Sequence, residues 1–127
     1  MLAEPANCQR SEMISVVEDD RSVRRAMVSL LSSFGYAAAT FASAEDFLES
    51  DQVDKTTCLI CDVNMPGLSG LDLQSRLAAQ GREMPIIFIT ASTEETTRAR
   101  ALTAGALGVL TKPFDAGRLI EYIRLAL

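Results

Sequence analysis

Polar residues with complementary chemistry follow four short apolar runs in this chain. In sequence order they are Glu18, Asp19, Asp62, Thr90 and Lys112. Carboxylates can hold a hard divalent cation, and one carboxylate of such a group can act as a nucleophile. A lysine ammonium group and a threonine hydroxyl can stabilise the charge of a transferred phosphoryl group. If the four runs end side by side, these residue types predict phosphoryl transfer that depends on magnesium.

The acidic residues Glu18, Asp19 and Asp62 predict the metal site. Two carboxylates about 4 Å apart repel each other by roughly 4 kcal/mol at an effective dielectric constant near 20, and a divalent cation turns this repulsion into binding. Mg²⁺ takes about six oxygen ligands and keeps several waters. Asp19, Asp62 and one backbone carbonyl would therefore suffice, with Glu18 acting through water. Asp62 would be the nucleophile and would become an acyl phosphate, which Lys112 and Thr90 would contact.

Each candidate also has a simpler interpretation. Asp62 is expected to be exposed at the edge of a sheet, where it could merely open the turn at Pro66-Gly67. Thr90 could be an ordinary β-branched strand residue, and Lys112 could be a solvated surface lysine. However, the chain contains only one other lysine, Lys55. The functional interpretation is favoured because all the candidates follow strands.

The apolar runs are expected to be buried strands that alternate with helices. Apolar patterning and turn residues predict five strands, at about 14–17, 36–41, 58–62, 86–90 and 107–110. Helical spacing predicts a helix after each strand, beginning near 21, 44, 68, 93 and 116. This alternation predicts an α/β fold, a doubly wound three-layer sandwich with a parallel sheet. In such folds the functional crevice lies beyond the carboxyl ends of the strands.

Capping residues predict where several helices begin. Asp20, Ser43 and Asp115 are placed to cap the first, second and fifth helices. Ser92, with Glu95 three positions later, forms a capping box for the fourth helix. That helix has few apolar residues, so we expect it to pack loosely.

Composition limits the classes of function. With 127 residues, 48% of them hydrophobic, the chain is expected to form one globular domain at 13–127, after a flexible polar arm at 1–12. A net charge of −5 and a pI near 4.7 argue against nucleic-acid binding. No signal peptide or apolar run of transmembrane length is visible, so no membrane contact is expected and the cytoplasm is the expected location. The absence of histidine excludes Ser-His-Asp and Cys-His catalysis and zinc sites with histidine ligands.

Cys58 and Cys61 have the spacing of a redox or metal-binding pair. If both lie on one strand, however, their odd offset directs the side chains to opposite faces. They then cannot share a metal or form a disulfide, and we expect buried, reduced thiols.

Four motifs, taken in order, resemble the response-regulator receiver domains of two-component signalling, over about residues 13–127. The motifs are Val-Glu-Asp-Asp after the first strand, Cys-Asp-Val-Asn-Met-Pro-Gly-Leu-Ser-Gly around Asp62, Ile-Thr-Ala at the fourth strand and Leu-Thr-Lys-Pro-Phe at the fifth. The resemblance implies a CheY-like (flavodoxin-like) strand order of 2-1-3-4-5. It implies that Asp62 is phosphorylated by a histidine kinase or a histidine phosphotransfer protein. It also implies Mg²⁺ bound by Glu18, Asp19, Asp62 and the backbone carbonyl of Asn64, and a cis peptide bond at Lys112-Pro113.

The same resemblance predicts how the domain would signal. It would catalyse only its own phosphorylation and dephosphorylation, and would switch a face made by the fourth helix, the fifth strand and the fifth helix. An output domain or a second copy of the chain could use this face. The segment 44–48 is similar to regulators of the nitrogen-fixation type. One position departs from the family pattern: three residues before Lys112, where Tyr or Phe is usual, the chain has Val109, so we expect Thr90 and the loop after it to carry the change.

Three other functions were weighed against the same residues. A haloacid-dehalogenase-like phosphatase also uses Asp, Thr, Lys and acids around Mg²⁺, but its second aspartate would stand where this chain has Asn64. A receiver that only binds partners, without phosphorylation, is disfavoured because the acids, Thr90 and Lys112 are all present. A flavodoxin-like flavin binder is disfavoured because acids after the first strand would repel the cofactor phosphate.

Overall fold

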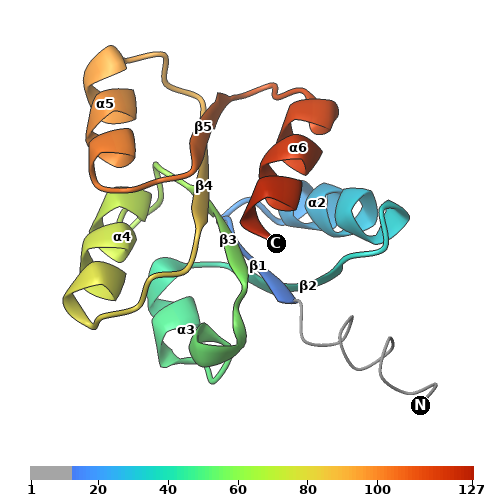
Figure 1. The fold of residues 1–127 in the computed structure, drawn as a ribbon, viewed down its shortest axis with the longest axis horizontal. Coiled ribbons are helices and arrows are strands. Elements are labelled where there is room, and N and C mark those ends of the chain that lie inside the picture. The colour runs from blue at the N-terminus through green and yellow to red at the C-terminus, as the bar shows by residue number, and fades with distance from the viewer. Residues whose placement is uncertain (1–12) are drawn as a thin grey trace.

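The structure is a computed structural model that describes residues 13–127. These residues form a five-stranded parallel sheet that lies between two layers of helices (Figure 1). The strands are β1 (Met13–Val17), β2 (Ala37–Phe41), β3 (Cys58–Asp62), β4 (Ile86–Thr90) and β5 (Gly108–Thr111). The helices are α2 (Arg21–Ser33), α3 (Ala44–Glu49), α4 (Gly70–Ala79), α5 (Glu95–Thr103) and α6 (Ala116–Ala126), with a 3₁₀ turn η1 (Val53–Lys55). The strand order β2-β1-β3-β4-β5 confirms the predicted topology. The expected arm at 1–12 lies outside the described residues.

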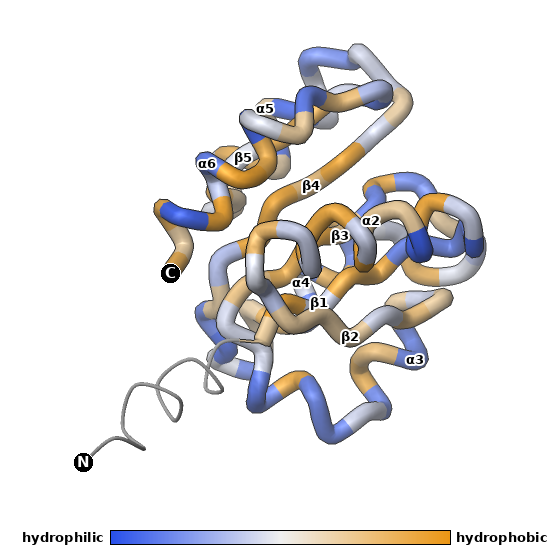
Figure 2. Tube along the Cα trace, turned by 90° about the vertical axis from the view of Figure 1, so that its right-hand side faces the viewer, coloured by the Kyte–Doolittle hydropathy of each residue, from blue (hydrophilic) through white to orange (hydrophobic). Residues whose placement is uncertain are grey.

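Side chains alternate across the strands and build one apolar cluster on each face of the sheet. Helices α3, α4 and α5 cover one face, and α2 and α6 cover the other (Figure 1). The central strands β3 and β4 are buried over their whole length and are strongly hydrophobic (Figure 2). A strand covered on both faces has no polar side to expose, which explains its continuous apolar run. As predicted, Cys58 and Cys61 are buried on opposite faces.

The predicted caps at Asp20, Ser43 and Asp115 are confirmed. Each side chain accepts a hydrogen bond from a backbone N–H in the first turn of its helix. Helix α4 carries a capping box that was not predicted, in which Ser69 and Asp72 each accept from the backbone of the other. These local bonds fix the loops that lead from the strand ends into α2 and α4.

The predicted capping box at Ser92 and Glu95 is wrong. Helix α5 begins at Glu95, with Glu94 at its N-cap. The hydroxyl of Ser92 accepts a hydrogen bond from the Glu94 N–H instead, so Ser92 forms a turn ahead of the helix. The expected loose packing is observed, since Ala101 is the buried residue of α5.

None of the described helices is long and apolar enough to cross a membrane.

Candidate functional site

The carboxyl ends of β1, β3, β4 and β5 bring the predicted residues together at one edge of the sheet. Glu18 and Asp19 follow β1, Asp62 and Thr90 end β3 and β4, and Lys112 follows β5. The parallel pairing of β3 with β4 and of β4 with β5 aligns these ends. Residues that are far apart in sequence therefore form one crevice because parallel strands all end on the same side.

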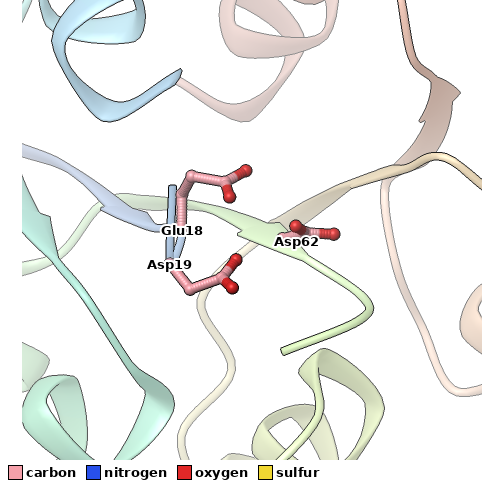
Figure 3. A group of neighbouring side chains, drawn as sticks. All are labelled: Glu18, Asp19 and Asp62. Atoms are coloured by element: carbon pink, nitrogen blue, oxygen red, sulfur yellow. The ribbon is translucent and has the colours of Figure 1, made fainter. Parts of the chain in front are cut away.

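The carboxylates of Glu18, Asp19 and Asp62, here called the acidic trio, lie close enough to hold one ion. One oxygen from each lies within 4.8 Å of the others. The side chains of Glu18 and Asp19 extend from the end of β1 toward Asp62 at the end of β3 (Figure 3). Glu18 and Asp62 are only 4% and 6% exposed, whereas Asp19 is exposed. The expectation that Asp62 is exposed is wrong, because β3 lies between β1 and β4 and Lys112 contacts the carboxylate.

Hydrogen bonds hold Glu18 on both its side chain and its backbone. Its Oε2 accepts from the Asp20 N–H at 3.0 Å, and its carbonyl oxygen accepts from Arg24 Nη1 at 2.7 Å. Burial raises the pKa of Glu18, the backbone N–H of Asp20 lowers it, the charge of Asp62 raises it, and Lys112 lowers it, with a net increase. The raised pKa reflects mainly the burial of the carboxyl group, to which the nearby charge of Asp62 adds.

Lys112 is the cation that contacts this charge. Its Nζ lies 3.2 Å from Glu18 Oε1 and 3.2 Å from Asp62 Oδ2. Burial by itself would lower the pKa of Lys112, but the hydrogen bonds and charges of Asp62 and Glu18 raise it above its ordinary value. The ammonium group is therefore protonated and lies in the crevice. The Lys112-Pro113 peptide bond is cis, as the resemblance implied.

Thr90 and Asn64 complete the crevice on the side of β4. Thr90 is 2% exposed, and its hydroxyl oxygen accepts a hydrogen bond from the Ser92 N–H at 3.0 Å. Asn64 donates from its backbone N–H to Asp62 Oδ1 at 3.2 Å, and its Nδ2 lies 3.5 Å from the Thr90 hydroxyl. Asn64 thus connects the carboxylate to the hydroxyl. That its carbonyl oxygen binds a metal stays a prediction.

Three residues near the crevice were missed in the sequence. Arg24 holds the backbone of Glu18. Glu45 of α3 accepts from the Leu68 N–H at 3.2 Å and so holds the loop after Asp62. At Gly70 a Cβ atom would lie 2.4 Å from the Asp62 carbonyl oxygen, so only glycine allows α4 to approach β3 this closely. Sequence signals exist for Arg24, which lies in the first turn of a helix that follows three acids, and for Gly70, which ends the motif around Asp62, but none exists for Glu45.

Comparison with known proteins identifies the family. A family model described as the response regulator receiver domain matches residues 14–124. The chain belongs to this family. It is therefore a receiver domain of two-component response regulators, as the four motifs predicted.

Individual relatives of the receiver domain are response regulators as well. Nodulation protein W of Bradyrhizobium diazoefficiens is 42% identical over 111 residues, which cover 87% of this chain and 49% of that protein. The chain spans about half the length of the curated relatives that it matches. Among solved structures, response regulator StyR has a TM-score of 0.85 at 40% identity, covering 91% of this chain and 59% of the other. FixJ-N has a TM-score of 0.82 at 30% identity, covering 91% of this chain and 92% of the other.

Proposed function

We propose that this receiver domain accepts a phosphoryl group on Asp62 from the phosphohistidine of a histidine kinase or a histidine phosphotransfer protein. The observation that carries the proposal is the pairing of a buried Asp62 carboxylate with Lys112, at 3.2 Å. A lone buried carboxylate would be unfavourable, whereas one beside a fixed cation is ready to receive an anionic group. In this proposal the domain acts in the cytoplasm and modifies only itself.

The acidic trio fits Mg²⁺. Carboxylate oxygens are the hard ligands that Mg²⁺ prefers, and their mutual distances of up to 4.8 Å suit ligands of one ion. In this proposal Asp19 and Asp62 bind directly, Glu18 binds through water, and the Asn64 carbonyl completes the protein ligands. When bound, Mg²⁺ supplies positive charge that offsets the carboxylates and the phosphoryl oxygens.

The side chains have separate roles in the transfer. A carboxylate oxygen of Asp62 forms the new bond to phosphorus as the bond from phosphorus to the donor histidine nitrogen breaks. The electron pair of the broken bond stays on that nitrogen, which leaves as a neutral imidazole once it is protonated. The Lys112 ammonium group pairs with the Asp62 carboxylate before the transfer and with the phosphoryl oxygens after it. In this proposal the Thr90 hydroxyl turns from Ser92 toward Asp62 and donates to a phosphoryl oxygen.

A small phosphodonor tests the acceptor. Wild-type protein is incubated with acetyl phosphate and Mg²⁺, and its intact mass is measured beside Asp62→Asn. We expect one phosphate adduct in the wild type and none in Asp62→Asn, because the amide is not a nucleophile. Asp51→Asn, which removes an exposed carboxylate, is the matched control and should behave as the wild type.

Two results would contradict the proposal. An equal adduct in Asp62→Asn would place the acceptor elsewhere. No adduct in any of the proteins, with folding intact, would favour the receiver that binds partners without phosphorylation.

The proposal extends to the longer protein. Since the relatives are about twice as long as this chain, we propose that the domain controls an output region or pairs with a second copy. The surface used would be α5, β5 and α6, which lies beside Thr90 and Lys112. Relatives named as transcriptional regulatory proteins make a DNA-binding output the natural candidate.

A further inference from the structure

Val109, the position that departs from the family pattern, borders a hollow of about 200 Å³ between α5 and the ends of β4 and β5. Thr90, Ser92 and Arg98 also line it. The Val109 side chain is 3% exposed and belongs to the apolar cluster on this face of the sheet. The space beside the phosphorylation site is thus bordered by a small aliphatic side chain and by a half-buried arginine.

Arg98 crosses from the helix to the strand. Its Nη1 donates a hydrogen bond to the Val109 carbonyl oxygen at 3.0 Å. A charged donor strengthens a hydrogen bond to a backbone carbonyl, and partial burial protects it from competing water. The bond therefore ties the first half of α5 to β5 at the residue where the family usually has an aromatic ring.

Helix α5 has few other attachments to the domain. Ala101 is its buried residue, and the Ala101 carbonyl accepts a hydrogen bond from Gln74 Nε2 of α4 at 3.2 Å. A helix with so little buried apolar surface is positioned mainly by such polar bonds. The Arg98 bond on the side of β5 and the Gln74 bond on the side of α4 thus set where α5 lies.

A chain of hydrogen bonds connects Thr90 to the start of this helix. The Thr90 hydroxyl accepts from the Ser92 N–H at 3.0 Å, and the Ser92 hydroxyl accepts from the Glu94 N–H at 3.1 Å. When the Thr90 hydroxyl turns toward a phosphoryl oxygen, the Ser92 N–H loses its acceptor. The turn before α5 must then rearrange, because a partly buried N–H needs a partner.

We propose that the Arg98–Val109 hydrogen bond is the latch of this receiver domain, and that its opening carries the phosphorylation signal from Thr90 to α5. This role rests on the proposed function of Asp62. Arg98 acts as a positioning residue: it holds α5 in the unphosphorylated arrangement and releases it when the turn at 91–94 shifts. Opening of the Arg98–Val109 hydrogen bond thus takes the place of the movement of an aromatic side chain on β5.

Hydrogen exchange of the α5 amides tests the latch. Exchange is followed by NMR in the wild type, Arg98→Gln and Arg100→Gln, each with Mg²⁺ and with or without beryllofluoride, which mimics a phosphoryl group on aspartate. Arg100→Gln removes the same charge from an exposed position of the same helix and is the matched control. We expect Arg98→Gln to exchange its α5 amides roughly five- to tenfold faster than the wild type without beryllofluoride, as for the loss of one hydrogen bond. Beryllofluoride should speed exchange in the wild type and in Arg100→Gln, and should add little in Arg98→Gln.

A second variant, Thr90→Val, and a second readout, the chemical shifts of residues 62–64, distinguish failure of the latch from failure of the proposed function. Thr90→Val keeps Arg98 but removes the acceptor of the Ser92 N–H, so its α5 amides should already exchange faster without beryllofluoride. Beryllofluoride should still bind this variant, seen as shifts at 62–64, and should add little to the exchange of α5. If α5 in Arg98→Gln keeps the protection and the response of the wild type while residues 62–64 respond, the latch is wrong and the acceptor site stands. If residues 62–64 of the wild type do not respond, the proposed function is wrong and the latch with it.

Discussion

At the scale of single residues, hydrogen-bond donors on both sides of Asp62 fix the orientation of its carboxylate. Oδ1 accepts from the Asn64 N–H and Oδ2 pairs with Lys112. Each carboxylate oxygen can accept two hydrogen bonds, so both keep capacity to bind a metal ion or attack phosphorus. Because this geometry is set in advance, the phosphoryl transfer that we propose would need little reorganisation, and burial of Asp62 is compatible with the proposed role.

The two buried cysteines permit a prediction about reactivity. Burial raises the pKa of Cys58 to about 12, and burial together with the charges of Asp62 and Glu18 raises the pKa of Cys61. A raised thiol pKa means that the protonated form persists at pH 8, where a thiol of pKa about 12 is thiolate in about one molecule in ten thousand. We therefore expect neither thiol to be alkylated by iodoacetamide in the native domain at pH 8.

The measurement is intact mass after alkylation of Cys8→Ser, which removes the third cysteine. Two adducts should appear in denaturant and none under native conditions over the same time. A native protein that gains an adduct at either position would show that its strand opens readily or that the thiol is accessible.

At the scale of helices and strands, the sequence predicted the helix caps that depend on hydrogen bonds between residues close together in the chain. The caps at Asp20 and Ser43 depend on residues two or three positions apart, and both were found. The capping box at Ser92 failed for a related reason, because a second local turn, closed by the Thr90 hydroxyl, competes for the same backbone. Residue types alone do not show which of two such local hydrogen-bonding arrangements is the more stable.

The crevice itself was predictable, but the bonds between elements were not. Candidates such as Asp62 and Lys112 followed from the rule that parallel strands end on one side. The Arg98–Val109 bond joins a helix to a strand, and its existence depends on how α5 lies against β5. Periodicity fixes which face of a helix is buried, not which carbonyl a long side chain reaches. For this reason the sequence predicted which residues lie at the crevice better than it predicted the contacts that support them.

Helix α4 gives a prediction about the contact between a helix and the site. The Gly70 N–H donates to the Val63 carbonyl at 2.8 Å, and a Cβ at Gly70 would lie 2.4 Å from the Asp62 carbonyl oxygen. We expect Gly70→Ala to lower the free energy of unfolding by about 1 to 3 kcal/mol, because backbone must move to admit the methyl group. The displaced Asp62 should also take phosphate from acetyl phosphate more slowly.

Urea unfolding, with Gly117→Ala as control, measures the effect. A Cβ at Gly117 would meet its nearest atom at 3.4 Å, an ordinary contact, and alanine is the better helix former, so this variant should be unchanged or stabilised by up to roughly 1 kcal/mol. Equal stability of Gly70→Ala and the wild type would mean that α4 can shift away from β3 at little cost.

At the scale of the whole molecule, the domain concentrates part of its negative charge at one edge of the sheet. The net charge is −5, and the acidic trio gathers three carboxylates within 4.8 Å. Only the folded chain creates this cluster, since β1 and β3 bring Asp19 and Asp62 together from distant positions. A cation that binds the cluster therefore favours the folded state, and folding and metal binding are linked.

The linkage predicts that Mg²⁺ raises the temperature of unfolding. At a Mg²⁺ concentration ten times the dissociation constant, the stabilisation is about 1.4 kcal/mol, or about 3 to 6 °C for a domain of this size. Thermal unfolding followed by circular dichroism in MgCl₂ should be compared with NaCl at equal ionic strength, because salt also screens the net negative charge. Asp19→Asn removes the exposed carboxylate of the acidic trio and should show a smaller shift, whereas Asp51→Asn should show the full shift. Equal shifts in NaCl and MgCl₂, or a full shift in Asp19→Asn, would mean that the stabilising cation does not bind at the acidic trio.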